Sequence, residues 1–296
     1  MKAELYKNSE YNYSEKFWGK DQERDYEHRA DQLAVLNALH KWNEWIVDLG
    51  GGFGRLVPTL KTRAEKIILV DASADLLKEA HEKYGNDRNI YFIRANLYHL
   101  PFQNNSFETG MCMRVMHHME HPEAYFKELD KVFYGSVHLE FPNKSHILQR
   151  LRFYALRDKS IHVTSLEPEV RNGMFINFKS DFLRKIINSE TRFAIEKYFG
   201  VSFFRHRVIK RIVSIRVLLF FESVLQHVTL VSKWAPSIML TLSKKKQKER
   251  KRASEIIDTL ACPLCSRAME TNASGVICTE GHSFPFENGI LDLYVE

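Results

Sequence analysis

The sequence predicts an α/β fold in which a mainly parallel sheet carries helices on both faces and a small module follows at the end of the chain. A glycine-rich turn comes directly after a short apolar run at 45–49. Apolar runs of strand length then alternate with segments of helical periodicity up to about residue 243. Three of the four cysteines gather with a histidine at 262–282, beyond this alternating region.

Length and composition narrow the class of protein. A chain of 296 residues can hold one α/β domain and an appendage. Its 44% hydrophobic and 27% charged residues are ordinary for a globular protein. The first residues lack the apolar core of a signal peptide, and four cysteines are too few for a disulfide framework in a chain this long. We therefore expect a cytoplasmic protein.

One short run accounts for the positive charge. Residues 244–252 contain seven Lys or Arg and one acid, which equals the formal net charge of +6 for the whole chain. We interpret 244–257 as a basic, solvated linker. A patch that binds phosphates or an anionic membrane is the alternative.

The turn at 48–54 has an acid and three glycines at alternate positions, namely Asp48, Gly50, Gly52 and Gly54. Glycines tolerate positive φ and let a ligand approach the backbone closely. A helix expected at 56–63 would add free N–H groups. The pattern predicts a nucleotide-binding turn. The dinucleotide fingerprint would need a glycine where Arg55 stands, and the sequence has no phosphate-loop motif.

An acid ends the next expected strand, 66–71. Asp71 stands 21 residues after Gly50, and a carboxylate at this edge of the sheet can accept hydrogen bonds from both hydroxyls of a ribose. The alternative is a cap for the helix expected at 74–84, but Ser73 is the better cap.

The other strands are expected at 90–95, 107–113, 136–141, 193–198 and 237–242, and further helices at 25–39, 122–133 and 180–187. Two segments interrupt the alternation. The first is an insertion at about 144–190, rich in basic and aromatic residues. The second is a helical segment at about 205–234, whose apolar part we interpret as a buried helix. That part, 217–231, is too short and too polar to span a membrane, and an amphipathic helix lying on a membrane surface is the alternative.

Together these motifs resemble the class I S-adenosylmethionine-dependent methyltransferases of the type 11 kind, over roughly residues 15–145. The resemblance implies a Rossmann-like seven-stranded sheet in a domain at 41–243, with residues 1–40 as a helical cover over the cofactor. A helix that only packs against the domain is the alternative for 25–39. It implies that Asn96 contacts the adenine amino group through its amide oxygen, where the family has an acid. The cofactor-binding residues expected on this basis are Asp48, Gly50, Gly52, Gly54, Asp71, Ala72, Asn96, Leu97 and Met113.

The last region, 258–296, predicts a zinc site. Its ligands would be Cys262, Cys265, Cys278 and His282, in the spacing C-x2-C-x12-C-x3-H. Four such ligands suit a closed, structural Zn²⁺, and a module this small needs that stability. It resembles the zinc ribbon of some methyltransferases, including those that methylate guanine N1 of ribosomal RNA, in which the ribbon is N-terminal. Cys112, by contrast, is expected in the core.

Methyl transfer needs an aligned acceptor, exclusion of water and, for some acceptors, a general base. The candidate bases are His117, His118, His121 and Glu140, which follow or end the fourth and fifth strands. No Asn/Asp-Pro-Pro-Tyr element follows the fourth strand, which in the resembled family argues against methylation of exocyclic base amines. We expect a small-molecule or lipid-linked acceptor. The alternatives are an RNA acceptor held by the basic run and the ribbon, and a cofactor binder without turnover.

Overall fold

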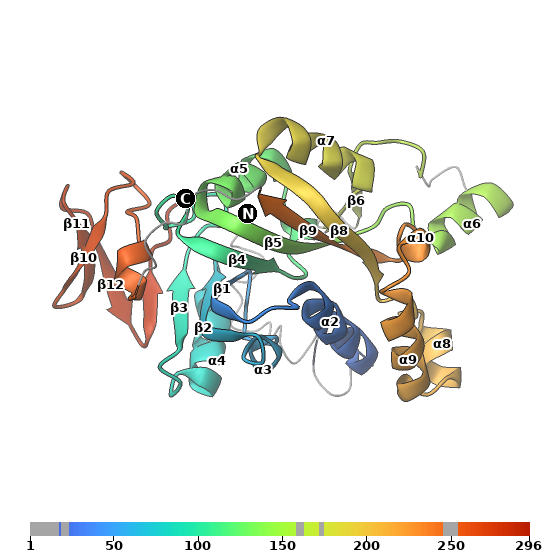
Figure 1. Ribbon diagram of the computed structural model, residues 1–296, viewed down its shortest axis with the longest axis horizontal. Coiled ribbons are helices and arrows are strands. Elements are labelled where there is room, and N and C mark those ends of the chain that lie inside the picture. Colours follow the sequence, from blue (N-terminus) through green and yellow to red (C-terminus); the bar gives the residue numbers. More distant parts are fainter. Residues whose placement is uncertain (1–17, 19–23, 158–162, 172–174, 245–253) are drawn as a thin grey trace.

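The computed structural model describes residues 18, 24–157, 163–171, 175–244 and 254–296. At its centre, seven strands follow the order β3-β2-β1-β4-β5-β9-β8 (Figure 1). Strands β1 to β5 are parallel, and β9 is antiparallel to both β5 and β8. The expected seven-stranded α/β sheet is confirmed. The strands are β1 (Asn43–Leu49), β2 (Ala64–Asp71), β3 (Ile90–Arg94), β4 (Phe107–Cys112), β5 (Phe133–Pro142), β8 (Phe193–Val201) and β9 (Ser237–Lys244).

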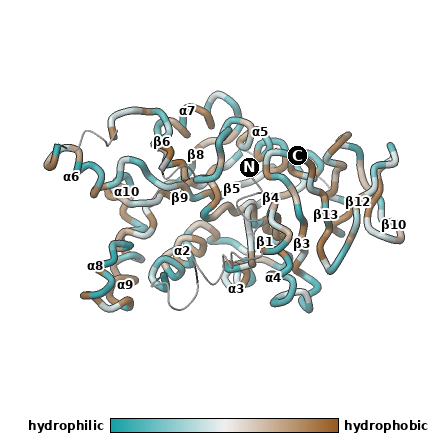
Figure 2. Tube along the Cα trace, turned by 180° about the vertical axis from the view of Figure 1, so that it is seen from behind, coloured by the Kyte–Doolittle hydropathy of each residue, from teal (hydrophilic) through white to brown (hydrophobic). Residues whose placement is uncertain are grey.

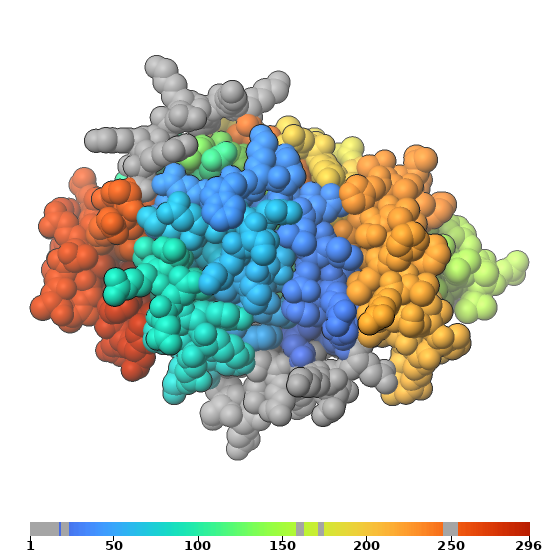
Figure 3. All heavy atoms as spheres, turned by 60° about the horizontal axis from the view of Figure 1, so that its bottom comes forward, coloured from blue at the N-terminus to red at the C-terminus, as the bar shows by residue number. Residues whose placement is uncertain are grey.

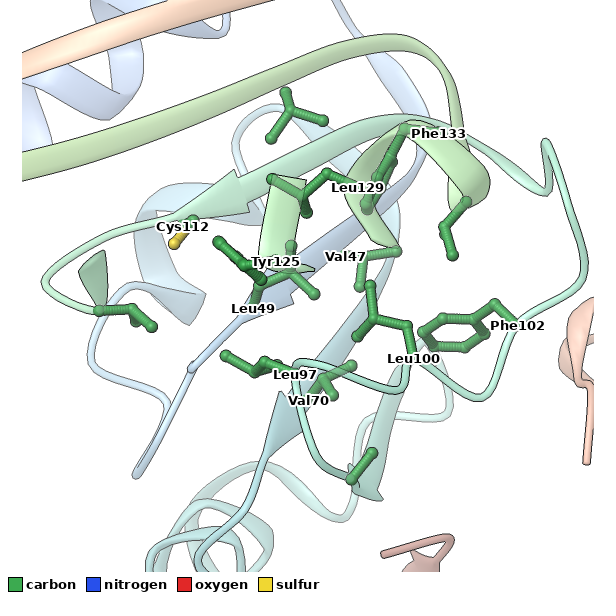
Figure 4. Close-up of a cluster of buried hydrophobic side chains, with 14 of the residues drawn as sticks. Val47, Leu49, Val70, Leu97, Leu100, Phe102, Cys112, Tyr125, Leu129 and Phe133 are labelled. Atoms are coloured by element: carbon green, nitrogen blue, oxygen red, sulfur yellow. The ribbon is translucent and has the colours of Figure 1, made fainter. Parts of the chain in front are cut away.

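Helices cover both faces of this sheet. One face carries α2 (Asp25–Ala38), α3 (Val57–Leu60) and α4 (Ala74–Tyr84), and the other carries α5 (Pro122–Val132) and α7 (Ser180–Glu190) (Figure 1). Successive strand residues point to opposite faces. Val47 and Leu49 therefore pack with Tyr125 of α5 (Figure 4), whereas Ile46 packs with the helices of the other face. This double burial explains why the strands read as continuous apolar runs.

The C-terminal module continues the same sheet. Its strands are β10 (Met269–Asn272), β11 (Gly275–Cys278), β12 (Ser283–Glu287) and β13 (Ile290–Asp292). β13 pairs in parallel with β3, so the sheet has eleven strands. Leu260 and Leu293 belong to the same buried cluster as Val70 of β2. The module thus extends the sheet and core of the larger domain.

The residue that opens the basic run is part of the core. Lys244 is 6% exposed at the end of β9. Its Nζ lies 3.2 Å from Asp130 Oδ1 and donates to Phe133 O at 2.5 Å. The prediction of a solvated linker is wrong for Lys244, because the cation is paired inside the domain. Residues 245–252 of the run lie outside the described residues.

Helix α6 of the insertion and the helical segment lie at the end of the molecule opposite the C-terminal module (Figures 1 and 3). The insertion forms α6 (Ile147–Ala155) and a two-stranded sheet of β6 (Glu169–Arg171) and β7 (Phe175–Asn177). The helical segment forms α8 (Arg207–Ile212), α9 (Ile215–Leu225) and α10 (Thr229–Ser232). None of the helices in the described ranges is long and apolar enough to cross a membrane.

The interpretation of 217–231 as a buried helix is wrong. Only a narrow stripe of α9, Leu218 and Glu222, is buried, while Phe220 is 64% exposed. Glu222, which interrupts this apolar segment in the sequence, anchors α9 to the rest of the domain. Glu222 accepts hydrogen bonds from Ser202 N at 2.7 Å and from the hydroxyl of Tyr26 in α2 at 2.5 Å.

Replacing this anchor should destabilise the protein. In Glu222→Leu the buried donors of Ser202, Phe203 and Tyr26 lose their acceptor, so we expect the free energy of unfolding to fall by about 2–4 kcal/mol in urea denaturation. Ser223→Ala, at the neighbouring, partly exposed position, should change it by less than about 0.5 kcal/mol. Equal effects of the two substitutions would show that Glu222 is no anchor.

Candidate active site

The glycine turn lies between β1 and α3, which is shorter than the helix expected at 56–63. Gly50, Gly52 and Gly54 have φ of 73°, 51° and 73°, in the left-handed region. A Cβ on Gly50 would stand 2.2 Å from Val115 Cγ2, and one on Gly54 would stand 2.8 Å from the Tyr84 ring. The turn therefore needs glycine both for its backbone angles and for its close packing.

Asp71 connects this turn to the start of α4. Its Oδ2 accepts from Gly52 N and its Oδ1 accepts from Ser73 N, both at 2.9 Å. Burial raises the pKa of Asp71, although the backbone hydrogen bonds act against this. Ser73 caps α4 through a 3.3 Å bond from Leu76 N, as the sequence indicated. Each carboxylate oxygen has a second lone pair that a ligand can use.

The turn and Asp71 line one side of a cleft of about 690 Å³, including its open mouth. Six of the residues expected to bind the cofactor line it: Asp48, Gly50, Gly52, Asp71, Leu97 and Met113. Trp18, Phe53, Arg55, Arg114, Val115 and His118 also belong to the lining. Burial raises the pKa of Asp48 to about 7. The structure thus brings most of the expected residues together at the carboxyl edge of β1, β2 and β4, where open α/β sheets bind ligands.

The other three expected residues lie around the cleft without lining it. Gly54 packs on Tyr84. The carbonyl oxygen of Ala72 accepts from Arg94 Nε at 3.1 Å. The amide of Asn96 is 8% exposed; its Oδ1 accepts from Tyr98 N at 3.1 Å, and its Nδ2 donates to Val295 O at 3.3 Å. One lone pair of this amide oxygen is thus already used, and the adenine contact of Asn96 stays a prediction.

A buried ion-pair cluster that sequence reasoning missed supports the cleft. Asp31 of α2 is 0% exposed and pairs with Arg114 Nη2 at 2.7 Å and Arg55 Nη2 at 2.9 Å. Burial alone would raise the pKa of Asp31, but the two guanidinium groups outweigh it and hold that pKa below its usual value. One feature of the sequence could have revealed this cluster: the acid Asp31 lies on the apolar face of α2, beside Ala30 and Ala34.

Arg114 directly follows β4 and Met113, with a left-handed φ of 61°. Glu140 holds it there. The Oε2 of Glu140 accepts from Arg114 N at 3.2 Å, and its Oε1 lies 3.7 Å from Arg114 Nη1. Glu140 is 1% exposed and stands beneath Arg114, outside the described lining of the cleft. This geometry suits a positioning role for Glu140 better than proton transfer to a substrate.

The two histidines after β4 lie in a short 3₁₀ helix, η3 (Met116–His118). Their ring centroids are 4.0 Å apart, and the ring of Phe175 in β7 lies 5.2 Å from His117 and 5.6 Å from His118. Only His118 of the pair lines the cleft. Burial lowers the pKa of His118 to about 4 and lowers that of His117 strongly. Both rings are therefore neutral near pH 7, and a neutral imidazole can accept a proton.

The predicted zinc ligands also meet. The ligand atoms of Cys262, Cys265, Cys278 and His282 all lie within 4.8 Å of one another. Cys265 Sγ is 3.6 Å from Cys278 Sγ, and Cys278 Sγ is 3.4 Å from His282 Nδ1. A tetrahedral zinc with thiolate ligands would separate them by about 3.8 Å, so the donor set and its spacing fit the metal. Cys112 is buried in β4, as expected.

Comparison with known proteins bears on the central domain. Residues 47–135 match the family model described as "Methyltransferase domain" (Methyltransf_11). An uncharacterized protein of Methanocaldococcus jannaschii is 33% identical over 87 residues, which are 29% of this chain. The matched stretch is 33% of that relative, so the chain spans about a third of its length.

Solved structures share the fold at low sequence identity. The PH0226 protein of Pyrococcus horikoshii has a TM-score of 0.53 at 15% identity, over 80% of this chain and 99% of that one. A methyltransferase of Haloferax volcanii, solved with the Trm112 methyltransferase activator, has a TM-score of 0.52 at 12% identity, over 79% and 98% of the chains. The fold is that of the class I S-adenosylmethionine-dependent methyltransferases. Within this fold, residues 47–135 are the part that matches the methyltransferase family model.

Loss of the Asp71 carboxylate should weaken cofactor binding. Asp71→Asn keeps the shape but removes a charged acceptor, so we expect the dissociation constant for S-adenosylmethionine to rise about 10- to 100-fold in titration calorimetry. The exposed Asp75 lies in the first turn of α4, and Asp75→Asn should leave the constant within about twofold. If both variants bind like the wild type, the ribose role of Asp71 is wrong.

Metal analysis should find one zinc ion per chain. In Cys278→Ala the ion should be lost and the free energy of unfolding should fall by about 3 kcal/mol or more, because the small module depends on the metal. Cys112→Ala removes a thiol from the core instead and should retain the zinc. Full zinc content in Cys278→Ala would argue against the four-ligand site.

Proposed function

We propose that the protein transfers the methyl group of S-adenosylmethionine to a small-molecule or lipid-linked acceptor. One observation carries this proposal: the glycine turn with Asp71 and the neutral His118 line the same cleft. When bound, the cofactor would supply a methyl group on a positively charged sulfur, for which no covalent enzyme intermediate is needed. The protein then has to orient two ligands and exclude water between them.

The residues of the cleft fit the polar groups of that cofactor. Asp71 can accept from the ribose hydroxyls through its remaining lone pairs. Arg114 and Arg55 place two guanidinium groups in the lining, which suits the carboxylate of the methionine part. The Asp31 carboxylate between them keeps both cations in place.

The acceptor side is formed by His118, its neighbour His117 and Phe175. A ring nitrogen of His118 would take the proton of a hydroxyl or ammonium acceptor as the methyl group is transferred. Burial keeps this imidazole neutral, with one ring nitrogen free of a proton, but the lowered pKa also makes it a weaker base. The largely apolar surroundings of Met113, Val115 and Phe175 would exclude water from the reacting atoms.

The C-terminal module has a part in this function. Arg94 of β3 donates to Asp292 Oδ2 at 2.8 Å and also to the carbonyl of Ala72, next to Asp71. The carbonyl of Val295 accepts from Asn96. We propose that the module stabilises the edge of the sheet at which the cofactor would bind, and so acts as a built-in activating element. The related Haloferax volcanii methyltransferase was solved with a separate activator.

The acceptor can be identified with labelled S-adenosylmethionine and a cell extract separated into lipid, small-metabolite and RNA fractions. We expect label in the lipid or metabolite fraction. His118→Ala should lower the rate about 100-fold while the dissociation constant for the cofactor stays within about threefold. Label in RNA would overturn the proposed acceptor class in favour of the alternative, and intact cofactor binding with label in no fraction would argue against methyl transfer.

A further inference from the structure

The described residues leave a large apolar surface exposed at one end of the molecule, far from the C-terminal module. We infer that this end, formed by α6, α8, α9 and α10, docks on the surface of an anionic phospholipid bilayer. All four helices gather at this end in both ribbon views (Figures 1 and 2). The docking surface extends the proposed function, but its binding to lipid does not depend on methyl transfer.

Large apolar side chains on this surface point to solvent. The exposed fractions run from 42% to 80% for Leu151, Tyr154, Ile212, Phe220, Leu230 and Trp234. Soluble proteins rarely expose so many large apolar residues together unless they bind something. Two of these residues, Tyr154 and Trp234, are of the kind that favours the boundary between lipid and water.

Cations accompany the apolar residues. Residues 205–234 contain six Lys or Arg and a single acid, Glu222, which is buried against α2. Lys210 pairs with Glu27 of α2 at 2.7 Å, whereas Arg216 and Lys233 are exposed. The sequence of α6, Ile147–Ala155, has Arg150 and Arg152 and no acid. Polar and apolar residues alternate closely along α8 and α9 (Figure 2). Basic amphipathic helices of this kind lie in the interface of anionic membranes.

Hydrogen bonds join the start of α6 to the residues just beyond α10. Ile147 N at the start of α6 donates to Trp234 O at 3.0 Å, just beyond α10. The side-chain amide of Asn143 donates to Lys233 O at 2.9 Å. Figure 3 shows α6 beyond the segment of α8 and α9 at the same end of the molecule.

The position of α6 connects this surface to the cleft. α6 follows shortly after the carboxyl end of β5, the edge of the sheet that also carries Arg114 and His118. A protein docked through α6 would therefore hold its cleft near the bilayer. An acceptor with an apolar tail could then reach His118 from the lipid, which is where this inference rests on the proposed function.

Vesicle sedimentation with the full-length protein tests the docking without any cofactor. Vesicles of phosphatidylcholine with phosphatidylglycerol should bind the protein at least about tenfold more tightly than phosphatidylcholine alone. The double variant Phe220→Ser, Phe221→Ser and the single variant Arg216→Glu should each lose about tenfold in affinity for the anionic vesicles. Two substitutions elsewhere serve as controls, Trp42→Ser for an exposed apolar residue and Lys78→Glu for an exposed cation, and both should bind like the wild type.

Three results would overturn the inference. The wild type could fail to sediment with anionic vesicles, or the controls could lose as much affinity as the surface variants. Size-exclusion chromatography could instead show a wild-type dimer that Phe220→Ser, Phe221→Ser converts to a monomer, which would make the surface an interface between two copies. Unchanged cofactor affinity of the variants shows that they are folded, and a failure of lipid binding leaves the methyl-transfer proposal to its own test.

Discussion

The hydrogen bond from Gly52 N to the Asp71 carboxylate is the contact on which the rest of the site depends. It joins the turn after β1 to the end of β2, and the other oxygen of Asp71 fixes the start of α4. The turn can approach so closely only because Gly50 and Gly52 take positive φ. Around this contact, Asp31 holds two arginines on one side of the cleft, and Arg94 supports Ala72 on the other.

Without the C-terminal module, β3 would be an exposed edge strand of the central sheet, which explains why β13 matters to the whole domain. An exposed edge invites pairing with another chain, and β13 occupies this one. β13 comes from the module that carries the four candidate metal ligands. We propose that metal binding, the pairing of β13 with β3 and support of the sheet edge beside the cleft are linked through residues 292–295.

Local patterns predicted much of the fold and the composition of the cleft. The buried parallel strands read as apolar runs, and Ser73 marked the start of α4 at the observed residue. The clustering of the four candidate metal ligands followed from their spacing alone. Each of these features depends on residues that are close together in the sequence, so no knowledge of distant contacts was needed.

The features that the sequence did not reveal depend on contacts between distant segments. Asp31 meets Arg114 across 83 residues, and Glu222 meets Tyr26 across 196. For the same reason, neither the contact of Glu140 with Arg114 nor the burial of Lys244 in the core could be predicted. The sequence around a titratable residue does not tell whether its side chain is exposed or buried against a distant partner.

The central claim is that the glycine turn and Asp71 form a site for S-adenosylmethionine. Its most direct test is calorimetric titration of the full-length protein with S-adenosylhomocysteine, with NAD and ATP as competing candidates. The account predicts one S-adenosylhomocysteine bound per chain and no binding of NAD or ATP in the same range of concentration. Binding of NAD or ATP with none of S-adenosylhomocysteine would contradict it.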